Sequence, residues 1–364
     1  MINFDFFAPT KILFGAGRES EVGKQVAAFG GHKVMIVYGK KGGHVETSGL
    51  LDRVHKSLSD AGLSYVDLNG VVPNPRLSLV KEGIRIGRAE GVDFLLPIGG
   101  GSVIDTAKGI GYGIANDFEM EDLLYGRVKT DKNLPIGVVL TIAAAGSEMS
   151  SSMVLTIEDG MMKRSYGHDC SRPKFAIMNP ELTYSLPAYQ TASGATDIMM
   201  HTMERYFTPT DTDTSLTDRI AEGLLVSVRD AAQTAVKEPE NYDARATLMS
   251  MSWAVCLMLP TVPDLPLSGE AGQDTCIRQI REDLRSLARK FSELMFPLQT
   301  RILKLHLQTP LLSQPSPPGK TGAVPSICQP TLPNWASSQP TPKLKKWLKN
   351  AYSAATAMSV SSSR

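Results

Sequence analysis

Short, mainly apolar runs alternate with amphipathic segments through the first third of the sequence. The runs 33–38, 65–68 and 93–98 have the length of strands that are buried in a parallel sheet. Between them, residues 48–61 and 77–90 carry apolar side chains at helical spacing. Strands and helices that alternate at this spacing are typical of βαβ units, so we expect an α/β fold with a parallel sheet covered on both faces.

The pattern becomes mainly helical after Pro187, where residues 188–206 and 215–236 both predict helices. We therefore expect an α/β dinucleotide-binding domain over residues 1–183. An all-helical domain is expected to begin with residues 184–254.

Charge and composition change abruptly near residue 250. Residues 1–250 carry 25 basic and 31 acidic side chains, whereas residues 251–364 carry 13 and 6 and hold 13 of the 23 prolines. Proline-rich, acid-poor sequence is unsuited to a helical domain. We interpret residues 255–364 as an atypical, poorly ordered segment, and the helical domain as truncated or replaced after about residue 254.

The overall composition argues against several classes of protein. A net charge of +1 removes the strongest argument for binding to nucleic acid or to an acidic membrane. No apolar run approaches the ~20 residues needed to span a bilayer, and the first residues lack a secretory apolar stretch. The four cysteines lack the spacing of a disulfide framework or a thiolate zinc site. We expect a cytoplasmic protein with no nucleic-acid or membrane partner.

Three successive glycines, Gly99, Gly100 and Gly101, stand between a predicted strand and a predicted helix. Without Cβ atoms they allow close approach of a ligand, and the N–H groups at the helix start attract anions. Ser102 is suited to capping the helix or donating to a phosphate, and Asp105 suits the helix dipole. The turn predicts a pyrophosphate site. The alternative is a tight turn that requires positive φ.

The strand 33–38 is followed by Gly39, Lys40 and Lys41, at the place where an acid would bind an adenosine ribose hydroxyl. Two cations there favour NADP(H) over NAD(H), because they tolerate a 2′-phosphate. The alternative is that both lysines are simply solvated.

Asp197 and His201 are four residues apart in a predicted helix. This spacing places a carboxylate and an imidazole on one helix face, within reach of one metal ion. A plain hydrogen bond between the two side chains is the alternative. Two ligands also fall short of the three that catalytic metal sites typically use.

Seven segments of the chain, taken in their order and spacing, match the motifs of one protein family. They are residues 10–15, 73–76, 99–105, 139–148, 187–197, 201–207 and 237–243. Together they resemble the iron-containing, metal-dependent alcohol dehydrogenases, in the branch of NADPH-dependent butanol dehydrogenases and aldehyde reductases. The resemblance runs from residue 3 to about residue 249. It does not include the last third of the chain.

The resemblance implies hydride transfer between a nicotinamide cofactor and a small-molecule alcohol or aldehyde. A divalent metal, Fe²⁺ or Zn²⁺, would act as a Lewis acid on the substrate oxygen. A homodimer is also implied, and no catalytic residue is assigned. The cofactor-binding residues that we expect are Gly39, Gly100, Gly101, Ser102, Asp105, Thr141, Ser147 and Lys163. Lys163 is equally well explained as a solvated residue, and the expected metal ligands are Asp197 and His201.

The sequence departs from this family after about residue 250. The family completes its metal site with two further histidines, whereas only His306 follows His201 here, in surroundings that match neither motif. With only two matched ligands, we expect weak metal binding and little enzymatic activity. An abrupt loss of resemblance within one expected helix indicates a shifted reading frame. Translating the other two frames downstream of the Ala254 codon tests this hypothesis.

Two other functions stay open at this point. One is a catalytically inactive NADP-binding remnant without a metal centre. The other is a related NAD-dependent dehydrogenase of the glycerol or lactaldehyde type, against which the cations after Tyr38 argue.

Overall fold

The computed structural model describes residues 6–206 and 213–257. By its contacts the chain divides into two units, residues 1–265 and 266–364. The second unit lies outside the described residues, and so do His306 and almost all of the predicted atypical segment. The domain boundaries expected near residues 183 and 254 therefore stay predictions.

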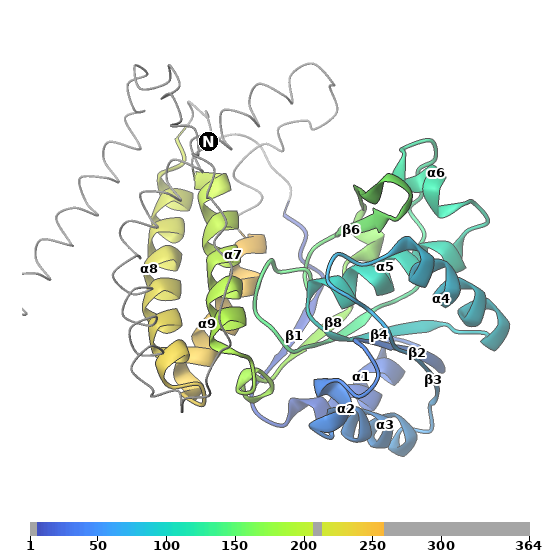
Figure 1. Ribbon diagram of the computed structural model, residues 1–364, viewed down its shortest axis with the longest axis horizontal. Coiled ribbons are helices and arrows are strands. Elements are labelled where there is room, and N and C mark those ends of the chain that lie inside the picture. The colour runs from blue at the N-terminus through green and yellow to red at the C-terminus, as the bar shows by residue number, and fades with distance from the viewer. Residues whose placement is uncertain (1–5, 207–212, 258–364) are drawn as a thin grey trace, which may run out of the picture. The chain divides into compact units, whose positions relative to one another are not determined.

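Six parallel strands form the central sheet, in the order β1-β8-β5-β4-β2-β3 (Figure 1). The strands are β1 (Lys11–Phe14), β2 (Lys33–Tyr38), β3 (Ser64–Leu68), β4 (Phe94–Gly99), β5 (Gly137–Leu140) and β8 (Phe175–Met178). The three strands expected from the apolar runs are confirmed as β2, β3 and β4. The chain passes from β2 outward to β3 and then returns to β4 on the other side of β2. The strand order therefore reverses between β2 and β4.

Helices cover both faces of this sheet (Figure 1). The first group is α1 (Val22–Ala28), α2 (His44–Thr47) and α3 (Leu50–Asp60), and the second is α4 (Leu77–Glu90), α5 (Gly101–Ala115) and α6 (Met120–Leu124). Short 3-10 turns are η1 (Arg18–Glu21), η2 (Asp159–Met161), η3 (Asp169–Ser171) and η4 (Pro180–Thr183). The expected parallel α/β architecture is confirmed.

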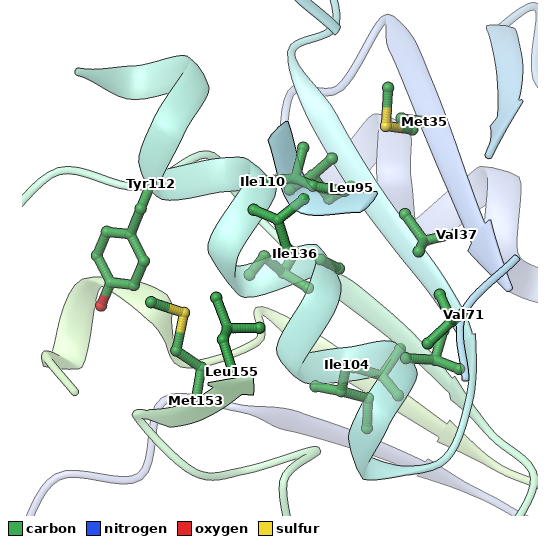
Figure 2. Close-up of a cluster of buried hydrophobic side chains, with 14 of the residues drawn as sticks. Met35, Val37, Val71, Leu95, Ile104, Ile110, Tyr112, Ile136, Met153 and Leu155 are labelled. Carbon is green, nitrogen blue, oxygen red and sulfur yellow. The ribbon is translucent and has the colours of Figure 1, made fainter. Parts of the chain in front are cut away.

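The two faces of β2 show why the sequence selects this layered arrangement. Val34 and Ile36 pack in the cluster that includes α1 and α3, whereas Met35 and Val37 pack in the cluster that includes α4 and α5. Successive side chains of a strand point to opposite faces, so an uninterrupted apolar run is stable only when both faces are covered. Figure 2 shows the second cluster, with Ile104 from α5 among its members.

A two-stranded antiparallel sheet, β6 (Ser152–Ile157) and β7 (Met162–Gly167), packs against α5. Met153 and Leu155 of β6 are fully buried in the same cluster as α5 (Figure 2). This contact places the start of β6 beside the middle of α5.

Three helices follow the sheet: α7 (Ala188–Tyr206), α8 (Ser215–Lys237) and α9 (Tyr242–Leu257). They confirm the helices predicted over 188–206 and 215–236. The three helices share one apolar cluster, which includes Ile198 of α7, Leu224 of α8 and Leu248 of α9. Among the described residues, no helix is both long enough and apolar enough to cross a membrane.

Candidate cofactor and metal site

A cavity of about 1030 Å³ lies where β2, β4 and β5 end. Its wall contains Gly39 and Lys40 after β2, residues 100–103 after β4, and residues 141–142 and 144–148 after β5. Ligands of open α/β sheets bind outside the carboxyl ends of the strands, where the strand order reverses. The cavity occupies that place, and its volume suits a small-molecule cofactor.

The three glycines after β4 differ in what a side chain would meet. A Cβ on Gly99 would lie 2.5 Å from Val103 Cγ2, and one on Gly100 would lie 2.3 Å from Ile142 Cγ2. A Cβ on Gly101 would meet nothing nearer than Ser147 Cβ at 4.0 Å, and both residues line the cavity. None of the three glycines has positive φ, so the alternative of a turn that requires positive φ is wrong. The first two glycines permit close packing, and the third leaves space that a ligand can fill.

The N-terminus of α5 faces this space. The amides of Val103 and Ile104 donate to Gly100 O at 3.0 and 3.1 Å. In the described part of the chain, the amides of Gly101 and Ser102 have no hydrogen-bond partner, and no side chain caps the helix. Two free amides at the positive end of a 15-residue helix form a site for an anion such as a pyrophosphate. The residues present therefore fit the phosphates of a dinucleotide.

The remaining predicted cofactor residues fall into two groups. Gly39, Thr141 and Ser147 line the cavity together with residues 100–102. Asp105 and Lys163 are not part of its lining. Asp105 Oδ1 accepts from Ser147 Oγ at 2.9 Å, and its Oδ2 accepts from Val154 N at 3.0 Å. Lys163 is exposed on β7, opposite Thr156 of β6.

Three ionisable side chains, Asp105, Lys108 and Glu148, are buried close to the cavity, and Glu148 is part of its lining. Lys108 is fully buried, and Glu148 is 1% exposed. Burial raises the pKa of the Asp105 carboxyl and of Glu148, while the positive charge of Lys108 opposes both shifts. Sequence reasoning singled out Asp105 alone. The available signal was a lysine three residues after it in an otherwise apolar helix.

Two further residues of the cavity were not assigned a role from the sequence. His44 lines the cavity beside Lys40, and its Nε2 lies 2.9 Å from Ser185 Oγ. Asn74, in the predicted turn after β3, also lines it and has a φ of 58°. A basic residue soon after β2 and an asparagine between two prolines were the sequence signals for these positions.

The predicted metal ligands lie on α7. A Cβ on Gly194 would lie 2.3 Å from Ala143 O, so this glycine lets α7 approach the segment after β5. Asp197, one turn later, lines the cavity. His201 Nε2 is 3.7 Å from Asp197 Oδ1, and the two side chains are 35% and 44% exposed. The helix thus places a carboxylate and an imidazole side by side, with the carboxylate at the cavity wall.

These two donors are fewer than a catalytic metal site uses. Within residues 6–206 and 213–257, no group of three His, Cys, Asp or Glu side chains is arranged to hold a metal ion. Catalytic zinc sites typically use about three protein ligands. The described residues therefore offer half of a metal site.

Comparisons with known proteins converge on one family. The family model described as iron-containing alcohol dehydrogenase matches residues 9–180. NADH-dependent butanol dehydrogenase A of Clostridium acetobutylicum is 39% identical over 259 residues, which cover 71% of this chain and 65% of that protein. The NADPH-dependent aldehyde reductase of Escherichia coli is 37% identical over 258 residues, covering 70% and 64%.

A solved structure supports the same relationship. NADH-dependent butanol dehydrogenase A from Thermotoga maritima matches with a TM-score of 0.67 at 35% identity, covering 70% of this chain and 63% of that one. The chain thus spans slightly less than two thirds of the length of these relatives.

Proposed function

Because the chain belongs to the iron-containing alcohol dehydrogenase family, we propose that it is an oxidoreductase acting on a small primary alcohol or aldehyde with NADP(H). The observation that carries this proposal is a pair of amides, Gly101 and Ser102, that have no hydrogen-bond partner among the described residues and lie at the wall of a cavity that Asp197 also lines. Cofactor phosphates at the glycine turn and a reacting carbonyl near Asp197 would then occupy one cavity.

The proposed role of this chain is to bind and orient. The amides of Gly101 and Ser102 bind the pyrophosphate, and the missing side chain of Gly101 leaves room for it. Thr141 and Ser147 line the same cavity and are expected to lie beside the bound cofactor. A bound nicotinamide supplies or accepts the hydride.

The proposed preference for NADP(H) rests on the end of the cavity next to β2. Lys40 and His44 line it. The nearby carboxylate of Glu46 instead accepts from Tyr38 Oη at 3.0 Å and from Gly42 N at 2.7 Å, outside the lining. A basic end favours a 2′-phosphate. The relatives include both NADH- and NADPH-dependent enzymes, so an NAD-dependent dehydrogenase is the alternative within this class.

A second candidate function follows from the incomplete set of metal ligands on α7. Asp197 and His201 are two donors where about three are typical. We therefore propose weak metal binding and low activity for this chain. An NADP-binding protein without a metal centre is the second candidate, and no catalytic step is assigned to a metal here.

One set of measurements on the full chain separates these functions. The protein is titrated with NADPH and with NADH by cofactor fluorescence, its metal content is measured, and butanal reduction is assayed with added Fe²⁺ or Zn²⁺. The dehydrogenase predicts tighter binding of NADPH and metal-dependent turnover. The inactive remnant predicts NADPH binding without stoichiometric metal or turnover.

A folded chain that binds neither cofactor would rule out both functions. Circular dichroism establishes that the sample is folded. Tighter binding of NADH would select the NAD-dependent alternative. The expected homodimer stays a prediction, to be checked by light scattering.

A further inference from the structure

Lys108 lies within α5, and its ammonium group is enclosed by oxygen atoms. Lys108 Nζ donates to the carbonyl oxygens of Ser147 at 2.9 Å, Ser150 at 2.8 Å and Ser152 at 2.9 Å. It also lies 3.1 Å from Ser147 Oγ. The side chain is fully buried, so water does not replace these contacts. One side chain of α5 thereby holds three backbone carbonyls between the end of β5 and the start of β6.

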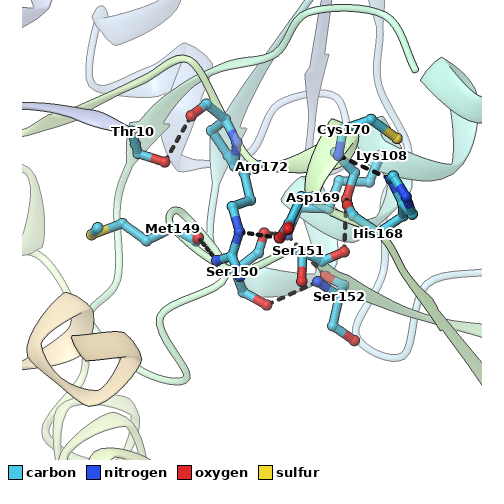
Figure 3. Close-up of polar contacts among 12 residues, drawn as sticks. Thr10, Lys108, Met149, Ser150, Ser151, Ser152, His168, Asp169, Cys170 and Arg172 are labelled. Atoms are coloured by element: carbon cyan, nitrogen blue, oxygen red, sulfur yellow. Dashed lines mark hydrogen bonds and ion pairs between the residues drawn. The ribbon is translucent and has the colours of Figure 1, made fainter. Parts of the chain in front are cut away.

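The segment that Lys108 holds is residues 144–152, which we call the cavity loop. Residues 144–151 belong to no helix or strand, and residues 144–148 line the cavity. Side chains outside the loop bind its other carbonyls. Arg172 Nη1 donates to Met149 O at 2.9 Å, and Ser171 Oγ donates to Ser151 O at 2.7 Å (Figure 3). The shape of the cavity loop therefore depends on these side-chain anchors.

Asp105, one turn before Lys108, binds the same loop. Its Oδ1 accepts the hydroxyl hydrogen of Ser147, and its Oδ2 accepts from Val154 N. Ser147 Oγ donates a hydrogen bond to Asp105 and accepts one from Lys108 Nζ. Because both partners belong to α5, this helix determines the orientation of the Ser147 hydroxyl. These contacts give Asp105 a role in shaping the loop, away from the cavity lining.

We propose that Lys108, together with Asp105, is a positioning residue that holds the cavity loop at the correct distance from the glycine turn. This inference rests on the proposed dinucleotide function. The cavity loop faces the turn directly, since a Cβ on Gly101 would lie 4.0 Å from Ser147 Cβ. A displaced loop would change the width of the space in which the cofactor phosphates bind.

The test replaces the ammonium and keeps the length of the side chain. Lys108→Met removes the donor from three carbonyls that are closed to water, and such groups are costly to leave unpaired. The loop is expected to rearrange, and the dissociation constant for NADPH is expected to rise about tenfold or more. Lys81→Met is the matched control, because Lys81 is 45% exposed on α4 and pairs with Glu121. The control is expected to bind NADPH like the unmodified chain.

A double variant tests whether Lys108 positions the cavity loop or only neutralises the charge of Asp105. Lys108→Met combined with Asp105→Asn removes both buried ionisable groups. If Lys108 only neutralises Asp105, the double variant should regain normal NADPH affinity, and that result would overturn the proposal. We expect the midpoint of thermal unfolding to recover partly while the NADPH affinity stays low.

Amide hydrogen exchange tests the inference without a cofactor. Exchange in residues 146–152 is expected to accelerate in Lys108→Met and to stay unchanged in Lys81→Met. Unchanged exchange in Lys108→Met would contradict the proposal even if the unmodified chain bound no dinucleotide. Absence of binding by the unmodified chain would instead reject the proposed function, so the two failures are distinguishable.

Discussion

The hydroxyl of Ser252, in α9, donates a 2.7 Å hydrogen bond to Oε1 of Glu148, in the cavity loop after β5. Both residues are buried, at 0% and 1% exposure. Burial raises the pKa of Glu148 above its ordinary value of 4.5, while the bond from Ser252 and the charge of Lys108 act in the opposite direction. The helical part of the chain is therefore joined to the cavity wall through a buried carboxyl whose pKa is raised.

This relationship predicts a pH-dependent stability. A carboxyl whose pKa is raised by folding binds its proton more tightly in the folded state, so its contribution to stability is lost as pH rises above 4.5 towards the folded value. Glu148→Gln keeps an acceptor for Ser252 but does not ionise. The variant is expected to lose less free energy of unfolding than the unmodified chain between about pH 5 and pH 8, measured by urea titration.

Glu240→Gln is the control for that comparison, because Glu240 is exposed. Its free energy of unfolding should follow the pH profile of the unmodified chain. Equal profiles for Glu148→Gln and the unmodified chain would mean that Glu148 does not favour its proton in the folded state.

Two neighbouring substitutions in the glycine turn are expected to differ in effect: one should lower stability and the other should weaken NADPH binding. Gly100→Ala places a methyl 2.3 Å from Ile142 Cγ2 and should cost about 1–3 kcal/mol of stability. Gly101→Ala places its methyl in open space and should change stability by less than about 1 kcal/mol, but weaken NADPH binding about tenfold. Thermal unfolding and cofactor titration measure the two effects. Normal NADPH affinity in a folded Gly101→Ala protein would contradict the proposed phosphate site.

Lys40 is expected to discriminate between the two nicotinamide cofactors. It lines the cavity, whereas the adjacent Lys41 does not. Lys40→Ala should weaken NADPH binding about three- to tenfold and leave NADH binding unchanged, because only NADPH carries the 2′-phosphate. Lys41→Ala is the matched control. Equal losses for both variants would point to a general attraction of charge, which added salt would then screen.

Metal binding at α7 is expected to be weak. After dialysis against a chelator, the protein should retain less than about one tenth of an equivalent of iron or zinc, because the described donors number two where about three are typical. His201→Ala should lower the remaining affinity for added Zn²⁺. His32→Ala, which breaks a solvent-exposed pair with Asp93, should not. Retention of one full equivalent of metal would show that further ligands complete the site.

The local elements of this fold were predictable from the sequence. The run 33–38 coincides with β2, and the range 77–90 coincides with α4. Both predictions succeed because the period of apolar residues reports which faces of an element are covered, and that period is a local property. The position of the glycine turn between a strand and a helix was predictable for the same reason.

The tertiary structure alone decided which residues face the cavity. Asp105 and Lys108 lie next to the glycine turn in sequence, yet their side chains bind the cavity loop, about 40 residues further along the chain. His44 also lines the cavity, although its place after β2 does not by itself show that its side chain faces a ligand site. Periodicity determined the strands and helices, but the partner of a buried charge depends on contacts between distant segments, which exist only once the layers have packed.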